Sequence, residues 1–302
     1  MTGARAVRKS IDWGELAPLR LRARQVAEGV FAGVHRSNKR GAGVEFGGYR
    51  EYVQGDDLRW LDRRSLLRHE RLVVRQFETE TDRVLCLLVD ASASMGFRGP
   101  GSPGAKLAFA AVVAAALARV AIASGDPVSL TFLGGGAHAV NVPRSSGRDQ
   151  FERIVGALEA VEPGGDAMED PAMLDRALHA LARVTRRGAI VVLLGDLVDL
   201  PERAPEQVAA LAPAGRVLSV VQTLDPAEVS FPYEGTVRLR ALEGGTVVET
   251  DADATRDKYV SALEALTSGW REALVRKGGR FLRATTTDDA VEVVRSIVEA
   301  VR

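Results

Sequence analysis

The chain has 302 residues, of which 46% are apolar and 26% are charged, and its formal net charge is zero. This length and composition allow a sizeable core in one large domain or two small ones, and they exclude an intrinsically disordered chain. The single cysteine excludes a disulfide within the chain, and no apolar stretch typical of a signal peptide follows the basic N-terminal residues. We therefore expect a cytoplasmic protein.

The charge is distributed unevenly along the chain. Residues 1–78 contain sixteen Lys and Arg against ten Asp and Glu, whereas residues 79–302 contain twenty-four against thirty. This asymmetry favours contact between the two parts of the chain, or an acidic partner for the first part.

The N-terminal segment begins with a predicted amphipathic helix over residues 16–34. A basic, glycine-containing stretch follows, in which Arg36, Lys39 and Arg40 could contact phosphate or nucleic acid. A solvated turn explains the same residues, and we favour it because no aromatic residues or nucleic-acid motif accompany them.

Residues 44–80 alternate acidic and basic side chains at short spacing. The cluster of Asp56, Asp57 and Asp62 could form a metal or acid–base site. Each of these carboxylates has an Arg nearby in the sequence, however, so a network of ion pairs is the favoured interpretation.

Six consecutive apolar residues, 84–89, predict a strand buried on both faces, as in parallel sheets. The strand ends at Asp90, and Ser92 and Ser94 follow at alternate positions. The carboxyl ends of such strands face the ligand crevice of an open α/β sheet. One carboxylate and two hydroxyls suit a hard cation such as Mg²⁺, although a turn that bonds its own backbone would use the same residues.

Asp-x-Ser-x-Ser after a buried strand resembles the metal ion-dependent adhesion site of von Willebrand factor A domains. A further string of residues resembles an uncharacterised bacterial family that couples such a charged block to a von Willebrand A-like domain: Glu45-Phe46, Arg50-Glu51-Tyr52, Gly55-Asp56-Asp57-Leu58-Arg59, Asp62, Val74-Arg75 and Glu80. Members of this family are typically encoded beside MoxR-type AAA+ ATPases, which implies such an ATPase, or its client protein, as partner. Arg63 stands where the family usually has Trp, and this puts one local packing contact in doubt.

Two later loops complete the resemblance. Gly164-Gly165-Asp166 stands where von Willebrand A domains commonly read Gly-Gly-Thr, and Asp196 follows the apolar strand 189–195 in the place of a third metal-site residue. Asp166 adds a negative charge that would bind the cation more tightly and weaken its pull on an external carboxylate. The resemblance therefore implies a site for Mg²⁺ or Mn²⁺ made of Asp90, Ser92, Ser94, Asp166 and Asp196.

Strands alternate with helices through the rest of the chain, including an alanine-rich helix over 107–124 that should be buried and a short edge strand over 138–142. We expect an α/β fold, von Willebrand A-like and Rossmann-like, with a mostly parallel sheet and helices on both faces. Residues 1–82, the N-terminal helix and charge-rich block, should pack on a main domain of residues 83–302, with a hairpin insertion near 225–250.

The sequence contains no nucleophile motif, no zinc-ligand spacing and no phosphate-loop fingerprint. We therefore expect a non-enzymatic interaction or adaptor protein, and the resemblance implies that it acts with a MoxR-type AAA+ ATPase. A metal-dependent hydrolase that uses Asp90, Asp166 and Asp196 is the alternative, because three carboxylates can hold Mg²⁺ and orient water. Nucleic-acid binding through the basic N-terminal stretch is a third.

Overall fold

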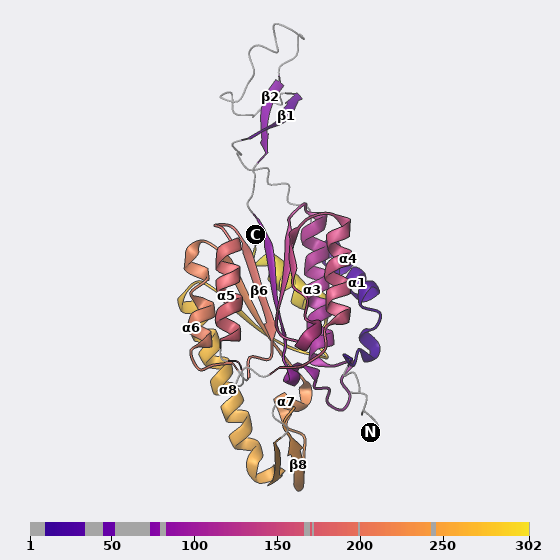
Figure 1. Ribbon diagram of the computed structural model, residues 1–302, viewed down its shortest axis with the longest axis vertical. Helices are drawn as coiled ribbons and strands as arrows, with labels where there is room; N and C mark the ends of the chain where they lie inside the picture. Colours follow the sequence, from indigo (N-terminus) through magenta and orange to yellow (C-terminus); the bar gives the residue numbers. More distant parts are fainter. Residues whose placement is uncertain are drawn as a thin grey trace, which may run out of the picture. The chain divides into compact units, whose positions relative to one another are not determined.

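The computed structural model describes residues 10–33, 45–51, 73–78, 83–165, 170, 172–198, 200–242 and 246–301. Contacts divide the chain into two units, one made of Met1–Gly33 with Arg83–Arg302 and the other of Val34–Asp82. In the smaller unit, β1 (Glu45–Glu51) and β2 (Val73–Glu78) pair antiparallel, with a register shift between Phe46 and Gly48 (Figure 1). The basic stretch with Arg36, Lys39 and Arg40 and the cluster at Asp56, Asp57 and Asp62 lie outside the described residues.

The larger unit is built on a six-stranded sheet with the strand order β10-β7-β6-β3-β4-β5. All neighbouring pairs are parallel except β4 and β5. The strands are β3 (Leu85–Ala91), β4 (Val128–Gly134), β5 (Val142–Ser145), β6 (Ile190–Gly195), β7 (Val217–Leu224) and β10 (Arg280–Thr285). The predicted mostly parallel α/β sheet is thus confirmed.

Helices cover both faces of this sheet (Figure 1). One face carries α1 (Leu19–Gly33), α3 (Lys106–Ala123), α4 (Arg148–Ala160) and α9 (Ala290–Glu299). The other carries α5 (Met173–Val184), α6 (Ala204–Ala209) and α8 (Ala252–Arg276). Side chains alternate along β3, so Cys86 and Leu88 join the core cluster beneath α5, α6 and α8.

Helix α3 is the centre of the first face. Among the described residues it alone is long and apolar enough to suit a membrane span, yet 78% of it is buried within the unit. Its small alanines let it lie close to β3 and to the neighbouring helices α1, α4 and α9. It is therefore the core helix that its composition predicts.

The edge of the sheet differs from the prediction. The glycines at 134–136 all have positive φ, and the chain then forms a short 3₁₀ turn, η4 (Gly136–His138), before β5 begins at Val142. Since that turn uses His138, this exposed residue is not part of the expected edge strand over 138–142. The remaining short turns are η1 (Gly14–Leu16), η3 (Ala93–Gly96) and η5 (Ala212–Ala214).

Residues 225–251 leave the alternating pattern. A short helix, α7 (Pro226–Ser230), follows β7, and β8 (Thr236–Arg240) then pairs antiparallel with β9 (Val247–Asp251) as a two-stranded hairpin. Asp251 caps α8 through its carboxylate, which accepts a hydrogen bond from the backbone N–H of Asp253 at 3.0 Å.

Candidate functional site

Two neighbouring strands bring the first predicted site residues together. The strands β3 and β6 are parallel and in register, with Val89 opposite Leu194, so Asp90 and Asp196 emerge side by side at their carboxyl ends. Gly195 makes this approach feasible, because a Cβ atom there would lie 2.6 Å from the Cβ of Asp90. Asp90 is 3% exposed and Asp196 is 1% exposed.

A third loop reaches the same edge. The backbone N–H of Gly164 donates to the carbonyl of Ala91 at 2.9 Å, and the N–H of Ala93 donates to the carbonyl of Gly165 at 3.2 Å. Asp166, the next residue, lies outside the described residues. The loop that precedes Asp166 therefore reaches the loop that carries Ser92 and Ser94, and the two are hydrogen-bonded through Gly164 and Gly165.

Hydrogen bonds order the side chains of the first loop. The carboxylate of Asp90 accepts from the backbone N–H of Ser92 at 2.9 Å, and the hydroxyls of Ser92 and Ser94 lie 3.1 Å apart. Ser94 also bonds the carboxylate of Asp196, which links the two strand ends. The alternative reading as a turn that bonds its own backbone thus describes part of the loop, since Asp90 does cap it.

Lys106, the first residue of α3, brings a cation into the same cluster. Its Nζ lies 2.8 Å from Oδ2 of Asp196 and 2.6 Å from Oε1 of Glu228, and its side chain is 1% exposed. Glu228 belongs to α7, far along the chain, and its other oxygen accepts the backbone N–H of Asp225 at 2.8 Å. The ammonium group therefore joins two carboxylates from two different elements.

Asp225 extends this network away from the strand ends. It caps α7 in a reciprocal box with Glu228, and its Oδ2 accepts from the backbone N–H of Gly99 at 2.8 Å and from Ser102 Oγ at 2.6 Å. These bonds tie the loop between η3 and α3 to the start of α7. As a result, the position of Glu228 is fixed both by Lys106 and by the hydrogen bonds of Asp225.

The pKa values of the charged groups in the cluster are shifted in different directions. Burial, and then the nearby charge of Asp196, raise the pKa of Asp90 to about 7. Burial also acts to raise the pKa of Asp196, but the charge of Lys106 and hydrogen bonds from Lys106 and Ser94 outweigh it and lower that pKa. For Lys106 the two carboxylates outweigh burial, so its pKa is raised and it stays protonated.

The oxygen donors of this edge suit a hard divalent cation, since they are carboxylates and hydroxyls. With every group ionised, the carboxylates of Asp90, Asp196 and Glu228 and the ammonium of Lys106 leave two negative charges, which one such cation would balance. Among the described residues, no three His, Cys, Asp or Glu side chains are grouped to hold a metal by themselves. A cation here would therefore rely on Ser92 and Ser94 as well.

Sequence reasoning missed Lys106, Glu228 and Asp225. The available signal for the first was a lysine opening an alanine-rich helix whose other charged residue, Arg119, lies near the far end, which is unusual for a helix buried nearly all round. For Asp225 and Glu228, the Asp-Pro-x-Glu sequence after a buried strand is the capping-box signature.

Comparisons with known proteins identify the family of the chain. The model of the family "Protein of unknown function DUF58" matches residues 48–268. Uncharacterized proteins of Mycobacterium tuberculosis and Mycobacterium bovis are 29% identical over 284 residues, which cover 93% of this chain and 87% of theirs.

Solved structures with a similar arrangement include BatB from Bacteroides thetaiotaomicron, with 19% identity, a TM-score of 0.48, and coverage of 72% of this chain and 98% of that one. A von Willebrand factor type A protein from Catenulispora acidiphila has 12% identity and a TM-score of 0.42, covering 76% of this chain and 43% of that one. The family match spans well over half of the sequence. The chain therefore belongs to the DUF58 family of proteins of unknown function.

Proposed function

We propose that this protein is a non-enzymatic interaction protein that acts in the cytoplasm with a MoxR-type AAA+ ATPase, or with a client of that ATPase. Its docking edge is a metal ion-dependent adhesion site for Mg²⁺ or Mn²⁺ at the carboxyl ends of β3 and β6. The partner is proposed from the resemblance of the 45–95 segment to a family typically encoded beside such ATPases.

The observation that carries the proposal is the convergence of Asp90, Ser92 and Ser94 with Asp196 across two adjacent parallel strands. These four residues would hold the cation, and Asp166 is proposed as a fifth. A bound cation would supply the positive charge that receives a carboxylate of the partner.

The chain's own residues prepare this edge. Lys106 fixes the carboxylates of Asp196 and Glu228, while the backbone N–H of Ser92 orients Asp90. Without a cation, the excess negative charge of the cluster would repel an acidic group from a partner. We therefore expect partner binding to require the metal.

The test is co-purification of the full chain with its neighbouring MoxR-type ATPase, in Mg²⁺ and in chelator, for wild type and Asp90→Ala. Asp149→Ala is the matched control, because Asp149 is an exposed carboxylate in the first turn of α4. We expect chelator and Asp90→Ala each to abolish co-purification, and Asp149→Ala to leave it unchanged.

Other outcomes separate the parts of the proposal. Co-purification that is indifferent to chelator and to Asp90→Ala would remove the metal from the mechanism and leave the interaction. No co-purification under any condition would refute the partner. Turnover of a generic phosphoester that is lost in Asp90→Ala would instead identify a hydrolase.

A further inference from the structure

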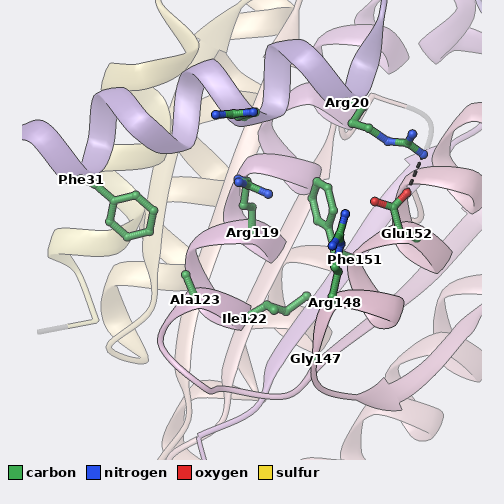
Figure 2. A pocket seen from close by; sticks show the side chains of 10 residues that line it. Arg20, Phe31, Arg119, Ile122, Ala123, Gly147, Arg148, Phe151 and Glu152 are labelled. Atoms are coloured by element: carbon green, nitrogen blue, oxygen red, sulfur yellow. Dashed lines mark ion pairs between the residues drawn. The ribbon is translucent and has the colours of Figure 1, made fainter.

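A second feature of the larger unit is a pocket of about 600 Å³ on its helical face (Figure 2). It is lined by Arg20, Arg24, Phe31, Arg119, Ile122, Ala123, Gly147, Arg148, Phe151 and Glu152. These residues come from α1, the last turns of α3 and the start of α4. We call this site the arginine pocket.

The arginine pocket is remote from the strand ends that carry Asp90. Lys106 opens α3, and Arg119 is the first pocket residue along that helix, so the two sites lie about 20 Å apart along its axis. A ligand at one site therefore does not contact the other, and the inference below is independent of the function proposed above.

The charge of the arginine pocket points to an anionic ligand. Its lining carries four arginines against one carboxylate, Glu152, which pairs with Arg20 at 2.5 Å. Arg24 pairs with Glu28 at 2.7 Å. Among the described residues, Arg119 and Arg148 form no ion pair with a carboxylate, so at least two cations are left uncompensated.

The placement of these two arginines supports the same ligand. The guanidinium of Arg119 lies 5.5 Å from the ring centroid of Phe151, a stacked contact that leaves its in-plane N–H donors available. Arg148 is in the first turn of α4, where a cation is unfavourable for the helix dipole. Helix stability therefore does not account for Arg148, whereas an anion near this terminus would favour both the helix and the arginine.

The apolar part of the lining favours a peptide over a simple anion as the ligand. Phe31 is 44% exposed although it is a large aromatic residue, and the half-buried Ile122 adds further apolar surface, while Phe151 is buried beneath Arg119. Figure 2 shows Phe31 and Arg20 at opposite ends of the pocket, with Arg119 between them. Along α1 these ends are about 16 Å apart, the length of about five residues of extended chain.

We propose that the arginine pocket binds an acidic segment of a partner protein that places an aromatic or aliphatic side chain among the arginines. The carboxylates of such a segment would pair with Arg119 and Arg148, and its apolar side chain would cover Phe31 and Ile122. A single phosphate would satisfy the charge and leave the apolar surface exposed, so the peptide fits the whole lining.

The test is selection of short random peptides by display on the immobilised full-length chain, with counter-selection on the Arg119→Glu/Arg148→Glu variant. We expect the enriched sequences to combine Asp or Glu with Phe, Leu or another apolar residue. Binding of one enriched peptide to each protein variant is then measured by fluorescence polarisation.

The peptide should bind the double variant at least about tenfold more weakly, because two attractive ion pairs are lost and two repulsions between like charges replace them. Arg238→Glu/Arg240→Glu is the matched control, because it makes the same charge change at exposed positions on β8 and should bind as wild type does. Phe31→Ser should also weaken binding, and it keeps the charge. If the double variant fails to fold, peptide binding to Arg148→Glu alone and to Phe31→Ser is compared with binding to wild type instead.

Several results would overturn the proposal. These are no enrichment, enriched peptides without acidic residues, or equal binding to the pocket variant and the control. Tighter binding of inorganic phosphate, ATP or phosphatidylglycerol vesicles than of any peptide, lost in the pocket variant, would assign the pocket to phosphate or to an anionic lipid surface instead.

Discussion

Replacing Lys106 by methionine tests the internal ion pairs most sharply, because Met keeps the length of the side chain and removes its charge. Lys106 is 1% exposed and lies within hydrogen-bond distance of both Asp196 and Glu228. Its removal would leave the buried carboxylate of Asp196 and the half-buried carboxylate of Glu228 without a counter-charge. Breaking a buried pair in this way typically costs about 3–5 kcal/mol, and we expect Lys106→Met to lose that much free energy of unfolding.

The assay is urea unfolding in chelator, so that no divalent cation replaces the missing ammonium. Arg203→Met is the control, because Arg203 pairs with Asp175 at 3.2 Å while its side chain is 66% exposed. A pair of that kind is worth about 1 kcal/mol or less. Adding Asp196→Asn and Glu228→Gln to Lys106→Met should recover part of the loss, since the two carboxylates that Lys106 paired are then neutral.

A loss below about 1 kcal/mol for Lys106→Met, equal to that of Arg203→Met, would refute the reasoning. It would show that the two carboxylates do not depend on the ammonium for their stability in the fold. A loss that persists undiminished in the triple variant would instead assign the effect to packing.

Two further predictions concern the strand ends. Because the pKa of Asp90 is raised to about 7 in the fold, its contribution to stability is fully present below the unfolded pKa near 4 and is lost as pH rises through 7. Asp90→Asn should therefore be more stable than wild type above pH 7 in chelator, by at most about 4 kcal/mol. Urea unfolding midpoints of both proteins, measured from pH 4 to 8, test this. If the midpoints of the two proteins changed with pH in parallel, the prediction would be contradicted. Gly195→Ala should lower the free energy of unfolding by about 1–3 kcal/mol because its Cβ would clash with Asp90, whereas Gly156→Ala in α4, which meets nothing within 4 Å, should be neutral or stabilising. Equal urea midpoints for the two alanine variants would contradict the close approach.

The sheet was predictable because its strands carry their own signal. The run 84–89 is apolar at every position and short, which is typical of a strand buried on both faces, and the structure buries all of β3. The same logic placed Asp90 and Asp196 at strand ends, because parallel strands point their carboxyl ends to one edge.

Lys106 could not be predicted as a buried ion, because its partners lie 90 and 122 residues away along the chain. A charged residue that opens a helix normally faces water, and although the apolar helix behind Lys106 is a signal, the sequence does not show which carboxylates would pair with it. The arginine pocket escaped prediction for a similar reason. Arg20 and Arg24 read as the polar face of an amphipathic helix, and only the packing of α1 on α3 and α4 sets them around Phe31 and Phe151.

The central claim is that the edge formed by Asp90, Ser92, Ser94 and Asp196 holds a divalent cation. Calorimetric titration of the metal-free protein with Mn²⁺ tests it most directly, on wild type, Asp90→Asn and Asp166→Thr. The account predicts one bound Mn²⁺ per chain in wild type, none in Asp90→Asn, and weaker binding in Asp166→Thr, which removes a proposed ligand charge. No heat of binding in wild type, or the same heat in Asp90→Asn, would contradict it.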